Sequence, residues 1–421
     1  MYALNSTSKL SQSPAQRQSR PVTAGTSISE VGMHSVRHVK SNLHFVWDSL
    51  TVFRHIRDSD SAFHYNRDLN GIEKTWKHAM TKSIMRLAHP EDCSLTVVDQ
   101  LSIAALSRAA VHKMMDLTNI SVRDVRTHPA GELVQSIRET LARWNLQVEA
   151  PEKLEQYILF SAQMAKTVYG YLKTDVQLQI ALYTFLAFRI DDLVLDNGAA
   201  EEFATRLCAG KPQLDPLLDC LAEVLEHMVD CYLPYAAQAI IVSTIQALNF
   251  TAFDKDTESM VLHGSAISFP QYRRMANGAG EAYAFFAWDK FTFPDVRSFV
   301  QAVPDVSRWF CYVNDVFSFY KEELAGERNN YVHDLSTVTG KDISTVLFDV
   351  VEDVASTTQR ARAVLKGHAL DAMEKFMQGY TYFFFIAPRY KVNHYLDVES
   401  FIAVPNARAP TSGGGSSSSH L

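Results

Sequence analysis

Three oxygen-bearing side chains recur at four-residue steps in the segment VNDVFSFYKEEL (313–324), namely Asn314, Ser318 and Glu322. Each four-residue step along an α-helix turns by about 400°, so the three side chains drift by only about 40° per step and share one face. An amide oxygen, a hydroxyl and a carboxylate are hard oxygen ligands of the kind that Mg²⁺ prefers. The spacing therefore predicts a divalent-metal site, here called the triad, on one helix face.

The alternative interpretation of this segment is a solvated polar stripe on an amphipathic helix. The side chains around the triad are aromatic, however; they are Tyr312, Phe317, Phe319 and Tyr320. Polar side chains among aromatic neighbours favour the metal site over a surface face. Lys321 lies beside Glu322 and is placed to reach phosphate oxygens.

An acidic cluster ends the apolar segment YTFLAFRIDDLVLDNG (183–198), which carries Asp191, Asp192 and Asp196. Carboxylates at the C-terminal end of a helix oppose its dipole, and like charges this close repel each other. A bound Mg²⁺ relieves both penalties and can bridge carboxylates to substrate phosphates. A helix end with solvated surface acids is the alternative, and the cluster alone does not decide between them.

Basic side chains that suit a phosphate group occur in two further segments. FPQYRRMANGAG carries Arg273 and Arg274 just after the expected start of a helix, and PRY carries Arg389 and Tyr390 near the end of the last long helix. The guanidinium group is a planar fork of donors that binds phosphate through two hydrogen bonds. Each arginine alone is typical of a surface ion pair, and it is their combination with the acidic segments that indicates a diphosphate site.

Helical periodicity connects these motifs from residue 43 to residue 403, and no series of short alternating strands interrupts it. Apolar residues recur at three- and four-residue steps in 154–172, 217–233 and 306–324. The sequence therefore predicts an all-α fold, a single helical bundle that encloses a deep active-site cavity between facing helices.

The two ends of the chain have a different composition. Residues 1–42 are rich in Ser, Thr, Gln and Pro, and residues 404–421 are rich in Gly and Ser, so we expect a disordered N-terminal tail and a flexible C-terminal tail. The leader is poor in acids, which makes a transit peptide the alternative, but it lacks an amphipathic stripe.

The overall composition argues against several partner classes. A net charge of −7 offers no positive field for nucleic acid. No run of about 18 apolar residues predicts a membrane span, and no short apolar core after basic residues predicts a secretory signal. Five dispersed cysteines are typical of reduced thiols in an intracellular protein. We therefore expect a cytoplasmic protein.

Taken together, the motifs resemble the class I terpene synthase pattern, specifically the fungal trichodiene synthase family, over roughly residues 160–395. IDDLVLD resembles the first metal motif, and NDVFSFYKE, followed by Glu327 and Arg328, resembles the Asn/Ser/Glu metal triad. FPQYRRMANGAG, with Trp288 ten residues after Gly278, resembles the segment with the diphosphate-sensing arginine. The register of this segment assigns that role to Arg274 rather than Arg273. PRY resembles the late Arg-Tyr pair that binds diphosphate.

The acidic motif departs from the family pattern at one position. The family's third acid stands four residues after the first, but here Leu195 occupies that position and the acid is Asp196. Position i+5 on a helix is about 140° from position i. We therefore expect Asp191 to hold the metal, Asp192 to support it and Asp196 to contribute little.

The resemblance implies a sesquiterpene cyclase, a carbon–oxygen lyase that ionises farnesyl diphosphate and releases diphosphate. It implies three Mg²⁺ ions, with Mn²⁺ as a substitute, and a small-molecule prenyl diphosphate as the partner, while a homodimer stays open. The expected metal ligands are Asp191, Asp192, Asn314, Ser318 and Glu322. The expected catalytic residues are Asp191, Arg274, Lys321, Arg389 and Tyr390.

A carbocation needs a pocket with aromatic faces and no loose water. The candidates for this lining are Phe188, Phe285, Trp309, Tyr312 and Phe317, each of which also suits an ordinary core. A first closure to a bisabolyl-type cation is expected, and trichodiene, cuparene-type and longiborneol-type products stay open.

Two other functions fit these motifs less well than a cyclase does. A chain-elongating prenyl transferase usually has two Asp-rich motifs, whereas the second site here is the triad. A non-catalytic protein that binds an isoprenoid would not need metal ligands and arginines together. The protonating class of cyclases needs a DxDD run, and DKDT (254–257) fails at its fourth position.

Overall fold

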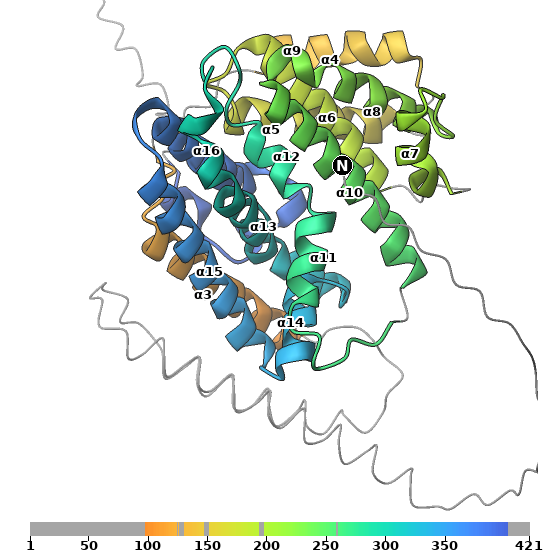
Figure 1. Ribbon diagram of the computed structural model, residues 1–421. Helices are drawn as coiled ribbons and strands as arrows, with labels where there is room; N and C mark the ends of the chain where they lie inside the picture. The colour runs from red at the N-terminus through yellow and green to blue at the C-terminus, as the bar shows by residue number, and fades with distance from the viewer. Residues whose placement is uncertain are drawn as a thin grey trace, which may run out of the picture. The chain divides into compact units, whose positions relative to one another are not determined.

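The computed structural model describes residues 97–123, 125, 130–146, 151–192, 198–257 and 260–402. All of them belong to one unit, which spans Asp60–Leu421. Every regular element in these ranges is a helix, so the predicted all-α fold is confirmed (Figure 1). The predicted tails 1–42 and 404–421 lie outside the described residues, as do residues 43–96.

The described chain forms fourteen α-helices and five short 3₁₀-helices. The first eight helices are α3 (Val97–Thr118), α4 (Gly131–Trp144), α5 (Pro151–Val168), α6 (Thr174–Asp192), α7 (Ala199–Cys208), α8 (Pro216–Glu226), α9 (Met228–Cys231) and α10 (Pro234–Asp256). They are followed by α11 (Phe269–Asn277), α12 (Gly280–Phe285), η1 (Val296–Ser298), η2 (Val300–Ala302), α13 (Val303–Ala325), α14 (Tyr331–Thr339), α15 (Ile343–Val364), α16 (Gly367–Ile386), η3 (Pro388–Tyr390), η4 (Val392–His394) and η5 (Val398–Ser400).

The ends of α13 follow from residues that start and stop helices. Pro304 stands in the first turn, where its missing N–H costs no helical hydrogen bond. At the other end Gly326 has φ 72°, a left-handed conformation that suits glycine. The N–H groups of Gly326 and Glu327 donate to the carbonyls of Glu323 and Glu322, so the last carbonyls of the helix are satisfied. These bonds hold the turn that carries Glu322 in place.

Helix α13 runs through the middle of the bundle (Figure 1) and packs against α3, α11, α12 and α15. A second layer pairs α5 with α6 and α16, and α10 packs against α7, α11 and α12. Buried apolar side chains from most of these helices form one core. The arrangement brings the C-terminal end of α6, the triad on α13 and the arginine segment of α11 into the same bundle.

The crossing of α5 and α16 depends on Gly379. A Cβ atom at this position would lie 2.3 Å from the Thr167 carbonyl oxygen and 2.8 Å from Val168 Cα. Both are backbone atoms, so only glycine permits this approach. The close crossing brings Phe383 of α16 against Phe160 of α5, with ring centroids 5.0 Å apart.

Among the described helices, α10 is long and apolar enough to cross a membrane by length and composition. The sequence analysis predicted no such segment. A core helix of a folded domain passes the same test, and α10 packs against four neighbouring helices, α7, α9, α11 and α12.

Candidate active site

The triad lies on α13, as the periodicity predicted. Ser318 is buried, and its Oγ has no hydrogen-bond partner in the part of the chain that the structure describes. A buried hydroxyl in a helix normally donates to a backbone carbonyl, because an unsatisfied one is costly. The unpaired oxygen stands between Asn314 and Glu322 on the same helical face. This donor set, with an orphaned hydroxyl at its centre, fits a divalent metal.

Arg274 reaches from α11 to α13. Its Nε donates to the Asp315 carboxylate at 2.9 Å, and its Nη2 donates to the Cys311 carbonyl at 3.0 Å and to Asn314 Oδ1 at 3.2 Å. The neighbouring Arg273 instead forms ion pairs with Asp254 and Asp334.

The register with the family assigned the diphosphate role to Arg274, and it is Arg274 whose guanidinium contacts the triad. Arg273 joins α11 to α10 and α14, and none of its ion pairs involves a triad residue. The two adjacent arginines therefore have different surroundings.

Glycines set the distance between α11 and α13. A Cβ at Gly278 would lie 2.7 Å from Arg274 Nη1 and 2.8 Å from Cys311 Sγ, and a Cβ at Gly280 would lie 2.6 Å from the same sulfur. Between them Ala279 has φ 46° and separates α11 from α12. The helix break therefore packs directly on α13, which fixes the guanidinium beside Asn314.

Asp315 is a site residue that the sequence analysis missed. Burial raises the pKa of its carboxyl to about 6, although the neighbouring Arg274 charge acts to lower it. Burial likewise opposes the charge of Arg274, but Asp315 outweighs it, so the pKa of Arg274 lies above its ordinary value. The pair is therefore a buried, hydrogen-bonded ion pair at the edge of the triad. The signal was an acid next to Asn314, but only the packing of α11 shows its partner.

Tyr390 on η3 connects the remaining predicted residues. Burial raises the pKa of its phenol above the usual range; the Arg389 charge lowers it, the Glu322 and Asp191 charges raise it, and a hydrogen bond with Asn314 lowers it. These residues come from α6, α13 and η3. The structure thus brings Asp191, Asn314, Glu322 and Arg389 within electrostatic range of one phenol.

The acidic end of α6 is described as far as Asp192. Asp191 is exposed in the last turn, and Asp192 is the final residue of the helix. Residues 193–197 lie outside the described ranges, so the expected minor role of Asp196 stays a prediction. On α13, Lys321 Nζ lies 3.2 Å from Glu322 Oε1, which keeps this ammonium at the triad.

Three of the five predicted aromatic residues lie in or next to one group of packed rings around Tyr380, here called the aromatic cluster. Phe188 packs edge-on against Phe160, and the Arg389 guanidinium carbon lies 5.4 Å from the centre of its ring. Phe317 stacks on Phe384 with ring centroids 4.5 Å apart, and the ring centroids of Trp309 and Tyr380 are 5.9 Å apart.

The other two predicted aromatic residues have different neighbours. Phe285 packs against Tyr235 and Phe299, and Tyr312 stacks on Tyr331 of α14 at 5.3 Å. Neither of these ring contacts involves the cluster that contains Tyr380.

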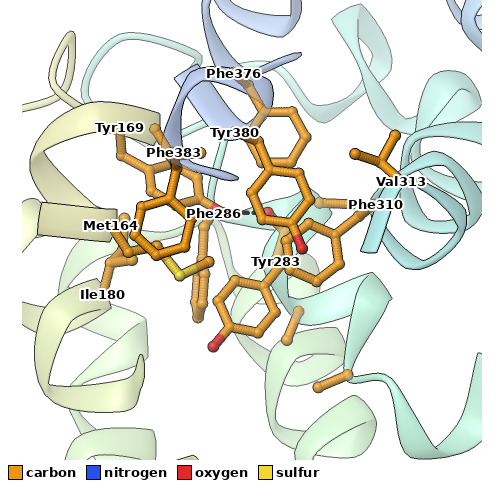
Figure 2. Packing of buried hydrophobic residues seen from close by; sticks show 14 of the residues in the cluster. Met164, Tyr169, Ile180, Tyr283, Phe286, Phe310, Val313, Phe376, Tyr380 and Phe383 are labelled. Atoms are coloured by element: carbon orange, nitrogen blue, oxygen red, sulfur yellow. Dashed lines mark hydrogen bonds between the residues drawn. The ribbon is translucent and has the colours of Figure 1, made fainter. Parts of the chain in front are cut away.

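The centre of the cluster consists of rings that the sequence analysis did not select. Phe310 is stacked between Tyr283, at 4.6 Å, and Tyr380, at 4.3 Å. Figure 2 shows these rings from α12, α13 and α16 facing one another. Phe310 stands four residues before Asn314 and so shares the face of the triad, which is the signal that identifies it.

Two hollows border the described residues away from the triad. One, of about 470 Å³, is shallow and is lined by the α7 residues Ala204, Thr205 and Cys208, with Ala209. The other, of about 400 Å³, lies at the N-terminal end of α6 near Asp175 and Cys231. Neither includes a predicted site residue, so the deep cavity at the triad stays a prediction.

The chain has clear relatives among known proteins. A sequence model of the family described as "Trichodiene synthase (TRI5)" matches residues 120–401. "Monoterpene synthase 25" of Postia placenta is 34% identical over 293 residues, which cover 69% of this chain and 86% of that protein. "Terpene synthase 29" of the same fungus is 35% identical over 248 residues, 58% of this chain and 73% of that protein. A "Longiborneol synthase" of Gibberella zeae is 28% identical over 260 residues, 60% of this chain and 76% of that protein.

An all-α bundle with these relatives is a terpene synthase, an enzyme that acts on a prenyl diphosphate. The match over residues 120–401 then decides the family: the chain belongs to the trichodiene synthase family.

Proposed function

We propose that this terpene synthase is a sesquiterpene cyclase that ionises farnesyl diphosphate with Mg²⁺ and cyclises the resulting carbocation. The observation that carries the proposal is the buried Ser318 hydroxyl between Asn314 and Glu322, which has no partner among the described residues. The Arg274 guanidinium is hydrogen-bonded to Asn314 beside it. Hard oxygen ligands beside a cationic donor fork suit a diphosphate that is bridged by metal ions.

We assign the metal ligands from the acidic motif at the end of α6 and from the triad. Asn314, Ser318 and Glu322 would hold one Mg²⁺, and Asp191 with Asp192 would hold the other two of the three ions, with Mn²⁺ as a substitute. When bound, the ions stabilise the negative charge that develops on the leaving diphosphate.

The protein's own donors bind the same group. Arg274 keeps its charge because Asp315 raises its pKa, and Arg389 and Lys321 add positive charge at the mouth of the site. Burial keeps the Tyr390 phenol protonated, so it acts as a hydrogen-bond donor to a diphosphate oxygen. These side chains orient the substrate and favour departure of the diphosphate.

The aromatic cluster suits the hydrocarbon part of the substrate. Phe310 and its stacked neighbours Tyr283 and Tyr380 present ring faces whose quadrupoles attract a cation. Their burial also excludes water, which would otherwise quench the cation early. We propose a bisabolyl-type cation as the first cyclic intermediate, with a trichodiene, cuparene or longiborneol type of skeleton as the product.

A shorter substrate is the second candidate, because one relative is named "Monoterpene synthase 25" and aligns over 86% of its length. In that case geranyl diphosphate replaces farnesyl diphosphate at the same diphosphate site. The difference between the two substrates lies in the hydrocarbon chain and therefore in the aromatic cluster rather than in the metal ligands.

The test is to incubate the purified full chain with each diphosphate and Mg²⁺, to measure released inorganic diphosphate, and to identify products by gas chromatography and mass spectrometry. We expect Mg²⁺-dependent release and a cyclic sesquiterpene from farnesyl diphosphate, and EDTA should stop both. Cyclic products from geranyl diphosphate alone would select the second candidate. No release from either substrate would refute the proposed function.

We also propose that the enzyme is cytoplasmic, because the substrate proposed for it is a small water-soluble diphosphate. A fluorescent fusion of the full chain should spread through the cytoplasm. Co-localisation with an organelle marker would instead support a transit peptide.

A further inference from the structure

One triad ligand is already engaged by another residue. Asn314 Oδ1 accepts a hydrogen bond from Arg274 Nη2 at 3.2 Å. A metal ion held by Asn314 must use this same oxygen, because the amide nitrogen carries two hydrogens and has no lone pair to offer. A guanidinium and a divalent cation on one oxygen repel each other strongly in a buried site.

Other contacts of Arg274 keep its guanidinium at this position. Its Nε donates to the buried Asp315 carboxylate and its Nη2 also donates to the Cys311 carbonyl. The absence of a side chain at Gly278 leaves just enough room for the guanidinium, since a Cβ there would lie 2.7 Å from Nη1. Two hydrogen bonds that involve no triad residue, together with the room left at Gly278, therefore hold the arginine against Asn314.

Ser318, the next residue of the triad, differs from Asn314 in its hydrogen bonding. The Ser318 hydroxyl is buried and unpaired, whereas the Asn314 amide is paired with the arginine. Of these two triad residues, only Asn314 is therefore bonded to a cationic side chain.

We propose that Arg274, held by Asp315, excludes divalent metal from Asn314 until a diphosphate draws the arginine away. The inference rests on the proposed function of the triad and adds an order to it. Metal alone binds the triad weakly, and diphosphate tightens metal binding because it offers the guanidinium a better partner than Asn314. A diphosphate that interacts differently with the two positions of the arginine shifts their populations, which couples the two ligands.

The experiment is a Mn²⁺ titration of the full chain without diphosphate, in which electron paramagnetic resonance measures free Mn²⁺. Arg274→Lys keeps the positive charge, but a single ammonium on a shorter reach cannot bond Asp315, the Cys311 carbonyl and Asn314 together. We expect Mn²⁺ to bind the triad about tenfold more tightly in this variant, which corresponds to about 1.4 kcal/mol.

Two controls separate this effect from a general change of charge or packing. In an Asn314→Ala background, Arg274→Lys should leave Mn²⁺ affinity unchanged, because no oxygen is released. Arg273→Lys alters the adjacent arginine, which pairs with Asp254 and Asp334, and should also leave it unchanged. If Arg274→Lys does not fold, Arg274→Gln in both backgrounds gives the same comparison.

Equal Mn²⁺ affinity of Arg274→Lys and wild type would overturn the inference, and so would an equal gain in the Asn314→Ala background. Turnover of the wild type decides the proposed function separately. If the wild type turns over substrate but Arg274→Lys binds Mn²⁺ no more tightly than the wild type, the proposed function stands and the competition between Arg274 and metal for Asn314 is ruled out. Tighter Mn²⁺ binding that depends on Asn314, in an enzyme that releases no diphosphate, would keep the competition and remove the function.

Discussion

We predict that removal of the Ser318 hydroxyl has opposite effects on stability and on activity. Ser318→Ala removes a buried polar atom that has no partner among the described residues. Relief of an unsatisfied hydroxyl is worth about 1 kcal/mol, and alanine adds about 0.5 kcal/mol of helix propensity over serine. We therefore expect the metal-free variant to be more stable than the wild type by about 1.5 kcal/mol.

Ser161 provides a matched control. It is also fully buried in a helix, α5, but its Oγ donates to the Tyr157 carbonyl at 2.7 Å. Ser161→Ala gains the same propensity and loses a hydrogen bond worth about 1 kcal/mol, so a net loss of about 0.5 kcal/mol is expected. The two variants should therefore differ by about 2 kcal/mol, or about 4 °C in melting temperature for a domain of this size.

The assay is thermal unfolding in EDTA, followed by circular dichroism, with turnover measured separately in Mg²⁺. Ser318→Ala should melt above the wild type and turn over substrate more slowly, whereas Ser161→Ala should melt slightly below it and retain activity. A loss of stability in Ser318→Ala equal to that in Ser161→Ala would show that the hydroxyl has a partner, and would refute the reasoning.

Three other variants test neighbouring parts of the site. Glu322→Gln keeps the size of the side chain but removes its charge, so turnover should fall by about a hundredfold or more; wild-type turnover at saturating Mg²⁺ would contradict the ligand assignment. Asp191→Asn should nearly abolish activity while Asp196→Asn is mild, and equal losses would show that the i+4 argument is wrong. Gly326→Ala should lower the free energy of unfolding by about 1 kcal/mol, because its φ is 72°; an unchanged denaturant midpoint would rule out this strain.

Local patterns in the sequence predicted most of the fold. The three- and four-residue periodicity at 306–324 predicted a helix, and this segment lies in α13, which begins at Val303 and ends at Ala325 before Gly326. The segment 217–233 has helical periodicity throughout, yet its helical residues form two helices, α8 and α9, which are separated at His227. Periodicity identifies helices well, but it does not locate such a break.

The site was predictable only where its residues share one helix. Asn314 and Ser318 are on one face by spacing alone, whereas the partnership of Arg274 with Asp315 depends on how α11 packs against α13. Tyr312 was expected to line the pocket for the carbocation, and it stands only two residues before Asn314 in the sequence. A two-residue step turns a helix by about 200°, however, and Tyr312 stacks on Tyr331 instead.

The buried phenols beside the triad have a consequence for how the proposed reaction ends. Burial raises the pKa values of Tyr283, Tyr380 and Tyr390, so all three stay protonated at physiological pH. A protonated phenol is a very poor proton acceptor, and the cyclised cation therefore cannot lose its final proton to this wall. Transfer of the proton to another base, such as the departed diphosphate, gives an olefin, whereas addition of water to the cation gives an alcohol, so the ratio of olefin to alcohol among the products reports how well the site keeps water from the last cation.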